Sequence, residues 1–191
     1  MNYPKGVKQV NTENYIKYDN RGMALENDLN LTNMYYIEKG IAYIYKKPTP
    51  IQVTKVDYKN NSLIIKEAYF KEPSTTDYNG IYKGKYIDFE AKETTNKTSF
   101  PLSNIHKHQI EHIRHIVSSK GICFLVVRFT LLDKTFILMG EDFLNYIDNN
   151  DRKSIPLSIF EEKGYKVDIS YRIRVDYLKV IDSIIGGNDG K

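Results

Sequence analysis

Two acidic residues and one lysine near the middle of the chain, Asp77, Glu90 and Lys92, could together hydrolyse a phosphodiester. Within Ile87–Lys92 apolar and charged residues alternate, as in a strand with one apolar face, and Asp88, Glu90 and Lys92 share the other face. Carboxylates are the ligands that Mg²⁺ prefers, and a lysine can polarise an attacking water and offset charge developing on phosphorus. We therefore predict catalytic roles for Asp77, Glu90 and Lys92.

The turn of the hairpin decides whether Asp77 lies near Glu90. A two-residue turn at Lys83–Gly84 places Asp77 opposite Glu90, and Thr75 opposite Lys92. Opposed side chains have Cβ atoms about 5 Å apart, so two carboxylates there repel each other unless a cation lies between them. We favour this turn because it gathers the polar residues, with Thr75 as a neutral oxygen ligand.

Two other interpretations of this segment stay open. A turn at Asn79–Gly80 has the stronger type I′ signature, but it pairs Asp77 with Tyr82 and disperses the polar group. Alternation alone is also typical of a half-solvated hairpin whose charges face water and do no chemistry.

Apolar periodicity and turn residues divide the chain into an N-terminal arm (1–20), a single domain (21–185) and a disordered tail (186–191). Ser103 is a candidate cap for one of the helices. The expected helices cover about 22–36, 104–118, 142–149, 157–163 and 174–185, and the expected strands cover 41–45, 51–58, 63–70, 122–129 and 135–139, besides the hairpin at 75–93.

The sequence of residues 46–70 predicts a hairpin that projects from the domain. Pro48 and Pro50 exclude a regular central strand at its base, and a polar turn separates its two β-rich halves. Lysines interleaved with tyrosines suit phosphate contacts and base stacking. The candidate DNA contacts are Lys46, Lys47, Tyr58 and Lys59.

All four histidines lie close together, at His106, His108, His112 and His115. Helical spacing could bring pairs of them onto one face to bind zinc, but no cysteine assists, and a solvated or DNA-facing surface is the favoured interpretation. Glu26, in the first expected helix, is a candidate acid near the metal.

Bulk properties indicate a globular protein of 191 residues with 41% hydrophobic residues and a net charge of +4, which permits a nucleic-acid partner without requiring one. The single cysteine, Cys123, lies in an apolar run and is expected in the core, which suits a reducing cytoplasm. Since no apolar run reaches the roughly 18 residues of a membrane span, no membrane association is expected.

The chain resembles the RecU family of Holliday-junction resolvases in a series of short sequence motifs that occur in the same order. These motifs are Arg21–Glu26, Lys46–Pro50, Glu67–Phe70, Ser74–Gly80, Ile87–Glu93, Lys97–Pro101 and His108–His112. The resemblance covers roughly residues 20–180. It implies a restriction-endonuclease-like α/β fold, with a mixed central sheet flanked by helices and a projecting hairpin stalk. It also implies a homodimer that cleaves four-way DNA junctions with Mg²⁺, or with Mn²⁺ as an alternative ion, alongside other recombination proteins.

Carried over by position, the resemblance makes Thr75, Asp77, Glu90 and Gln109 the metal-associated residues and Lys92 the group that stabilises the transition state. Where restriction-type sites usually have proline before the aspartate, this chain has Thr76, a departure shared with the resolvase family.

Fold and motif do not choose a substrate, so two alternatives remain. The chain could be a restriction-like or flap-type nuclease, or it could be a non-catalytic architectural protein that binds junctions and whose carboxylates are structural.

Overall fold

The computed structural model describes residues 23–59, 61–71, 75–167, 170 and 173–186. The arm expected over residues 1–20 lies outside the described residues, as does the tail expected over 186–191 apart from Gly186, which ends a helix. None of the helices in the described ranges is long and apolar enough to cross a membrane.

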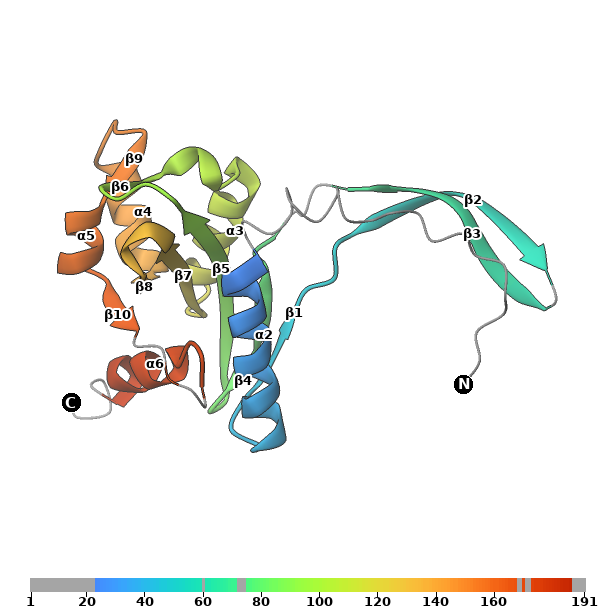
Figure 1. Ribbon diagram of the computed structural model, residues 1–191, viewed down its shortest axis with the longest axis horizontal. Coiled ribbons are helices and arrows are strands. Elements are labelled where there is room, and N and C mark those ends of the chain that lie inside the picture. The colour runs from blue at the N-terminus through green and yellow to red at the C-terminus, as the bar shows by residue number, and fades with distance from the viewer. Residues whose placement is uncertain (1–22, 60, 72–74, 168–169, 171–172, 187–191) are drawn as a thin grey trace.

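A six-stranded sheet forms the centre of the body, in the order β1-β4-β5-β7-β8-β10 (Figure 1). Its strands are β1 (Tyr43–Lys46), β4 (Tyr78–Tyr82), β5 (Lys85–Thr94), β7 (Ile122–Phe129), β8 (Lys134–Met139) and β10 (Tyr165–Val167). The β5–β7 pair is parallel and the other pairs are antiparallel, so the sheet is mixed.

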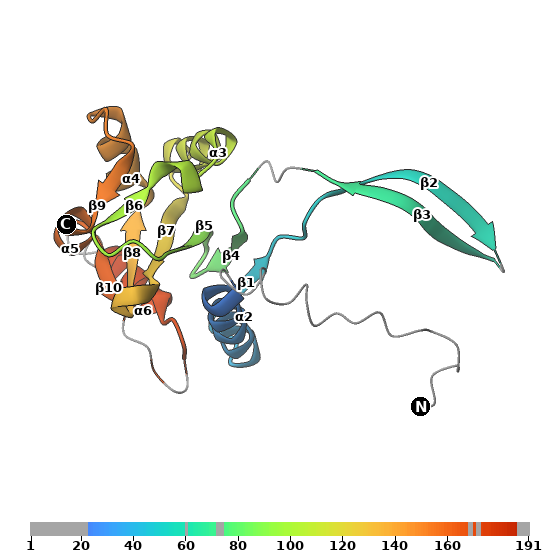
Figure 2. The ribbon, with the colours of Figure 1, turned by 45° about the horizontal axis from the view of Figure 1, so that its top comes forward.

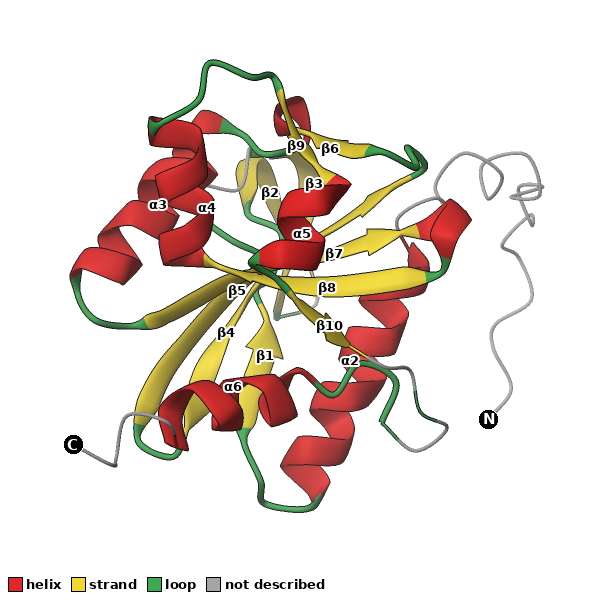
Figure 3. Ribbon diagram, turned by 90° about the vertical axis from the view of Figure 1, so that its left-hand side faces the viewer, coloured by secondary structure: helices red, strands yellow, loops and turns green. Residues whose placement is uncertain are grey.

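Helices cover both faces of this sheet (Figure 3). One face packs against α2 (Met23–Glu38) and α6 (Tyr177–Gly186), and the other against α3 (Lys107–Ser118), α4 (Gly140–Asp148) and α5 (Leu157–Glu162). The remaining elements are short strands β6 (Ser99–Pro101) and β9 (Ser154–Pro156), which pair with each other, and 3₁₀ turns η2 (Leu102–Asn104) and η3 (Thr130–Leu132).

The stalk is a two-stranded antiparallel ribbon of β2 (Ile51–Lys59) and β3 (Ser62–Phe70), which extends away from the body in both Figure 1 and Figure 2. Nearly every described residue of the two strands is exposed, and Tyr58 and Phe70 are 70% and 83% exposed. The expected α/β architecture, with a mixed central sheet flanked by helices and a projecting hairpin, is therefore confirmed.

Several sequence-based boundaries were wrong. The helix expected from residue 104 begins at Lys107 with His106 as its N-cap, and Ser103 instead lies in a 3₁₀ turn. The side chain of Gln109 accepts the backbone N–H of His106 at 2.9 Å, as part of a capping box at the start of the helix. The three-residue strands β6, β9 and β10 were not expected at all, because such short segments carry too little periodicity to be recognised.

The turn of the central hairpin lies at Lys83–Gly84, where both residues have positive φ, 47° and 73°, as a type I′ turn requires. The alternative turn at Asn79–Gly80 is wrong, because both residues lie within β4. Gly80 is needed there for close approach: a Cβ at this position would lie 2.1 Å from the carbonyl oxygen of Tyr43 on β1.

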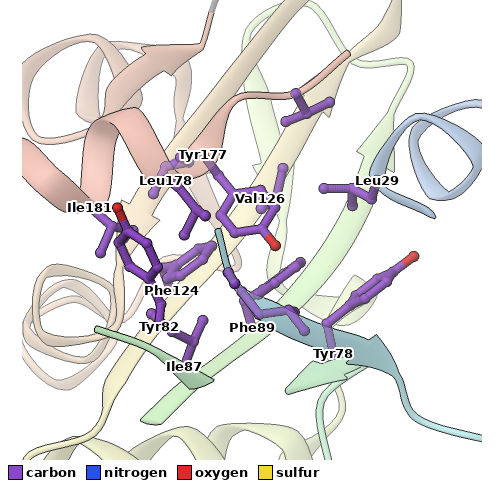
Figure 4. Close-up of a cluster of buried hydrophobic side chains, with 14 of the residues drawn as sticks. Leu29, Tyr78, Tyr82, Ile87, Phe89, Phe124, Val126, Tyr177, Leu178 and Ile181 are labelled. Atoms are coloured by element: carbon purple, nitrogen blue, oxygen red, sulfur yellow. The ribbon is translucent and has the colours of Figure 1, made fainter. Parts of the chain in front are cut away.

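A stack of three buried aromatic rings crosses the middle of the sheet (Figure 4). Tyr78 of β4 pairs in register with Phe89 of β5, which pairs with Phe124 of β7. The Tyr78 and Phe89 rings are 4.8 Å apart and 7° from parallel, and the Phe89 and Phe124 rings are 4.8 Å apart and 11° from parallel. Tyr177 of α6 packs against Phe89 and Phe124 from the helical layer.

We predict that Phe89→Ala lowers the free energy of unfolding by about 3–5 kcal/mol, because the ring is fully buried and lies at the centre of this stack. Urea unfolding provides the measurement. The matched control, Phe70→Ala on the exposed stalk, should change stability by no more than about 0.5 kcal/mol. Equal losses in the two variants would contradict a structural role specific to the stack.

Candidate active site

Asp77 and Glu90 lie next to the aromatic stack, one residue from Tyr78 and Phe89. The Tyr78–Phe89 pair is the last in the β4–β5 ladder. If the same register is extended by one residue, Asp77 lies opposite Glu90. The Asp77 carboxylate accepts the backbone N–H of Ala91 at 3.2 Å, which ties it to the strand that carries Glu90. The expected opposition of the two acidic residues therefore follows from the observed register.

Lys92 completes the predicted group. Its Nζ lies 2.5 Å from Oε1 of Glu90, and the lysine side chain remains 25% exposed while that of Glu90 is fully buried. The ammonium is thus held beside the carboxylate and still reaches the surface, where a substrate could contact it.

Helix α3 covers the polar face of β5, so the alternative in which these charges face water is wrong. Asp88 and Glu90 are both 0% exposed. Gln109, on the first turn of α3, is also buried, and its Nε2 donates to Oε1 of Glu90 at 2.7 Å. Its Oε1 accepts from His106, so in this arrangement Gln109 contacts the expected metal site through Glu90.

Burial changes the chemistry of Glu90. Loss of solvation, together with the nearby Asp77 carboxylate, raises the pKa of its carboxyl to about 7 against the opposing effect of the Lys92 ammonium. Near neutral pH, ionisation of Glu90 is therefore unfavourable in the folded protein unless additional positive charge lies nearby.

The acidic pair fits a divalent cation. Oε2 of Glu90 is buried and has no hydrogen-bond partner among the described residues, although buried carboxylate oxygens are normally paired. Within the described ranges no group of three or more His, Cys, Asp or Glu side chains could hold a metal ion alone. Mg²⁺, however, is commonly held by one or two carboxylates and keeps several waters, so the Asp77–Glu90 pair suits this ion.

Two clefts open beside Asp77. The larger, about 510 Å³, is lined by Asp77, Lys92 and Glu26, among others, so the lysine predicted to be catalytic shares this space with Asp77. The smaller, about 240 Å³, lies between Asp77 and the base of the stalk and includes Thr75. The Thr75 hydroxyl contacts the carbonyl of Thr76 at 3.4 Å, and its role as a metal ligand stays a prediction.

The candidate DNA contacts occupy two different environments. Tyr58 and Lys59 are exposed at the far end of the stalk. Lys46 at the stalk base forms a 2.5 Å ion pair with Glu26, which lines both clefts beside Asp77. Lys47 points into the body and forms a 2.8 Å ion pair with buried Asp88.

The histidines do not gather into a metal site within the described structure. The rings of His106 and His108 stack at 5.4 Å, His115 is exposed near the end of α3, and Nε2 of His112 lies 3.3 Å from Oδ2 of Asp88.

Sequence reasoning missed the importance of Asp88, which it placed on a polar face without a role. The order strand–helix–strand (β5, α3, β7) was the available signal, because the helix joining two parallel strands must cover one face of the sheet. A charged residue on a covered face requires partners, and Asp88 has them.

A mixed sheet flanked by helices, with opposed carboxylates and a lysine beside a cleft, has the features expected of a nuclease. The family model described as Recombination protein U (RecU) matches residues 20–183. The chain belongs to the RecU family.

Relatives of similar length are named Holliday junction resolvase RecU. The protein of Pediococcus pentosaceus is 51% identical, over 97% of this chain and 98% of its own length, and that of Oceanobacillus iheyensis is 48% identical, over 96% and 99%. The solved structure of Hjc, a Holliday junction resolvase of Archaeoglobus fulgidus, aligns with a TM-score of 0.45 at 9% identity, covering 76% of this chain and 95% of that one.

We predict that Glu90→Gln stabilises the metal-free protein at pH 8. A carboxyl whose pKa is raised by folding binds its proton more tightly in the folded state, so stability falls as pH rises from the ordinary value of 4.5 to about 7. Unfolding measured in chelator should show little difference between variant and wild type at pH 4, and a gain for the variant that reaches up to about 3 kcal/mol above pH 7.

Glu161→Gln is the control, because Glu161 is exposed and paired with Lys134. It should show no comparable dependence on pH. A Glu90→Gln variant with the same stability as wild type at every pH would contradict a raised pKa at this position.

Proposed function

We propose that the chain is a Mg²⁺-dependent endonuclease, with Mn²⁺ as an alternative ion, that resolves four-way (Holliday) junctions by paired phosphodiester cleavage during recombination and repair. The observation that carries the proposal is Glu90, a fully buried carboxylate with one unpartnered oxygen, which lies opposite Asp77 and in contact with Lys92. The chain belongs to a family whose relatives are named for this activity, which supports a four-way junction as the substrate.

Asp77 and Glu90 would hold the metal, with Thr75 and Gln109 as further oxygen ligands. When bound, Mg²⁺ supplies a Lewis acid for a phosphoryl oxygen and lowers the pKa of a water. Gln109 orients Glu90 by donating to Oε1, so a switch to ligation requires its amide to turn.

Lys92 reaches both the Glu90 carboxylate and the larger cleft. From this position its ammonium can hold an attacking water and offset the negative charge that grows on the phosphoryl oxygens. Because Glu90 is buried, water is largely excluded behind the reacting group, which strengthens the electrostatic interaction.

The stalk would provide selection of the junction. A ribbon that extends well away from the body could enter the open centre of a four-way junction, where a continuous duplex leaves no room (Figure 2). Exposed Tyr58 and Lys59 near its tip offer a ring for stacking on a base and a charge for a phosphate. Lys46 and Lys47 lie at its base, where converging strands would meet.

We propose that the active form is a homodimer, because resolution requires two cuts in opposed strands and a two-fold protein matches the pseudo-two-fold junction. Such an enzyme would act in the cytoplasm together with other recombination proteins.

We predict that Asp77→Asn abolishes junction cleavage and leaves junction binding nearly intact, because the change removes metal-binding charge and almost no volume. Cleavage and mobility-shift assays on a four-way junction measure the two properties. Ca²⁺ should support binding with little turnover, because its looser oxygen shell orients water poorly. Nicking by the variant at the wild-type rate in Mg²⁺ would rule out this site, and binding without any Mg²⁺-dependent nicking by the wild type would favour the architectural alternative.

We predict that Lys92→Ala lowers the cleavage rate by roughly 10²-fold or more, the scale of losing a group that stabilises transition-state charge. Metal affinity should stay the same or rise slightly, because a nearby positive charge is gone. Single-turnover cleavage across a Mg²⁺ titration distinguishes the roles: full recovery of the rate at saturating Mg²⁺ would show that Lys92 serves only metal binding.

We predict that replacing Asp57–Leu63 with a short glycine-containing turn lowers junction affinity by an order of magnitude or more, while duplex affinity changes little. The fold should persist, because none of the described residues in this part of the ribbon belongs to the core. Competition binding with junction and duplex probes provides the measurement. Normal junction affinity in the shortened protein would place selectivity elsewhere.

A further inference from the structure

Asp88 is a second fully buried carboxylate on β5, two residues from Glu90, and its environment is the opposite of that of Glu90. Oδ1 of Asp88 accepts the Thr76 hydroxyl. Oδ2 accepts Lys47 Nζ at 2.8 Å and the Tyr86 hydroxyl at 2.9 Å, and it lies 3.3 Å from Nε2 of His112. Both oxygens of Asp88 thus already accept hydrogen bonds from protein donors, whereas Oε2 of Glu90 has no partner among the described residues.

These partners come from separate parts of the chain. Lys47 follows β1 and begins the stalk, Thr76 directly precedes Asp77, and His112 lies on α3 one turn after Gln109. Asp88 therefore joins the stalk base, the segment that carries one acidic residue of the site, and the helix that contacts the other.

Lys47 strengthens this connection in three ways. Its Nζ donates to Thr76 Oγ1 at 2.9 Å as well as to Asp88, and its backbone N–H donates to the carbonyl oxygen of Asp77 at 2.8 Å. Its side chain is only 18% exposed. The backbone of Lys47 thus holds Asp77 directly, and its side chain holds the preceding residue, Thr76, and Asp88.

We propose that Lys47, Thr76 and Asp88 are positioning residues that fasten the stalk base to the catalytic hairpin and thereby hold Asp77 opposite Glu90. The inference rests on the proposed function for the role of Asp77 and Glu90 as metal ligands. It assigns Lys47 a role different from direct contact with a phosphate. It also makes the position of the stalk and the geometry of the acidic pair depend on the same contacts, so a displacement of one is transmitted to the other.

The test compares Thr76→Val, Lys47→Met, Asp88→Asn and the double variant Lys47→Met/Asp88→Asn. Thr76→Val keeps the shape and removes only the hydroxyl that bridges Asp88 and Lys47. For each protein we would measure Mn²⁺ affinity by calorimetry, junction affinity without divalent ions, single-turnover cleavage in Mg²⁺ and thermal stability.

Thr76→Val should lower Mn²⁺ affinity and the cleavage rate by about 10-fold or more, the scale found when groups behind metal ligands are removed, and leave junction affinity unchanged. Thr135→Val is the matched control: Thr135 is a buried threonine whose hydroxyl accepts from Arg128 Nε at 3.1 Å, away from the site. The control should lose stability and keep Mn²⁺ affinity. An equal loss of Mn²⁺ affinity in the control would overturn the proposal.

The double variant separates positioning from mere stability. Removing one member of a buried ion pair leaves an uncompensated charge, whereas removing both does not, so the double variant should be more stable than either single variant. Mn²⁺ affinity and cleavage should nevertheless stay low. Recovery of both together with stability would show that the network is only structural and would overturn the proposal.

Lys47→Met distinguishes a positioning role for Lys47 from direct contact with DNA. Weaker junction binding, with a salt dependence reduced by about one phosphate contact, would identify Lys47 as a direct DNA ligand and overturn the proposal. A wild-type protein that binds Mn²⁺ with Asp77 and Glu90 but does not cut junctions would disprove the proposed function instead. The comparison of Mn²⁺ affinities would still test the positioning role.

Discussion

The stack of Tyr78, Phe89 and Phe124 is the interaction on which the rest of the site depends. Three aromatic side chains that are register partners on adjacent strands pack face to face within the core, fully buried between the sheet and the α2–α6 layer. Because side chains alternate along a strand, a register shift of one residue would move the rings to the other face of the sheet, away from the α2–α6 layer. The same register that keeps the rings in the core brings Asp77 toward Glu90.

On the opposite face, the protein buries charge, and it does so in two ways. Asp88 lies among polar side chains from three other segments, and both of its oxygens accept hydrogen bonds from them. Glu90 keeps an unpartnered oxygen and a pKa raised to about 7 by burial and by Asp77. The fold thus supplies hydrogen bonds to Asp88 but leaves Glu90 in a position where ionisation is unfavourable. A cation beside Glu90 would relieve this electrostatic cost. A stable scaffold can in this way carry a site that lowers its stability when no ligand is bound.

The stalk follows different physical rules from the body. Within the part of the chain that the structure describes, its two strands pair with each other and supply no residue to the buried clusters, so their backbone hydrogen bonds define the ribbon without a core beneath it. Such a ribbon depends on its base for orientation. The contacts of Lys47 with Thr76, Asp77 and Asp88 supply that base, next to the acidic pair.

Local sequence patterns determined much of the architecture. Alternation identified β5, the continuous apolar run identified β7, and two prolines beside paired β-rich segments identified the stalk. The opposition of Asp77 and Glu90 was also predicted, but only after choosing between two turns of similar local quality. Residue composition favoured Asn79–Gly80, whereas the packing of Gly80 against β1 and the aromatic register select Lys83–Gly84.

Tertiary structure alone decided which charges are buried and what they contact. Alternation reports that Asp88 and Glu90 share a face, but that face meets water or protein according to where the crossover helix α3 packs. The direction of Lys47 and the start of α3 at Lys107 depend on partners far along the chain. Periodicity describes the conformation of one segment, whereas burial and ion pairing are properties of contacts between segments. The acidic pair and the lysine can be recognised in the sequence, but only the folded protein distinguishes Asp88, whose two oxygens accept hydrogen bonds, from Glu90, which keeps one oxygen without a partner among the described residues.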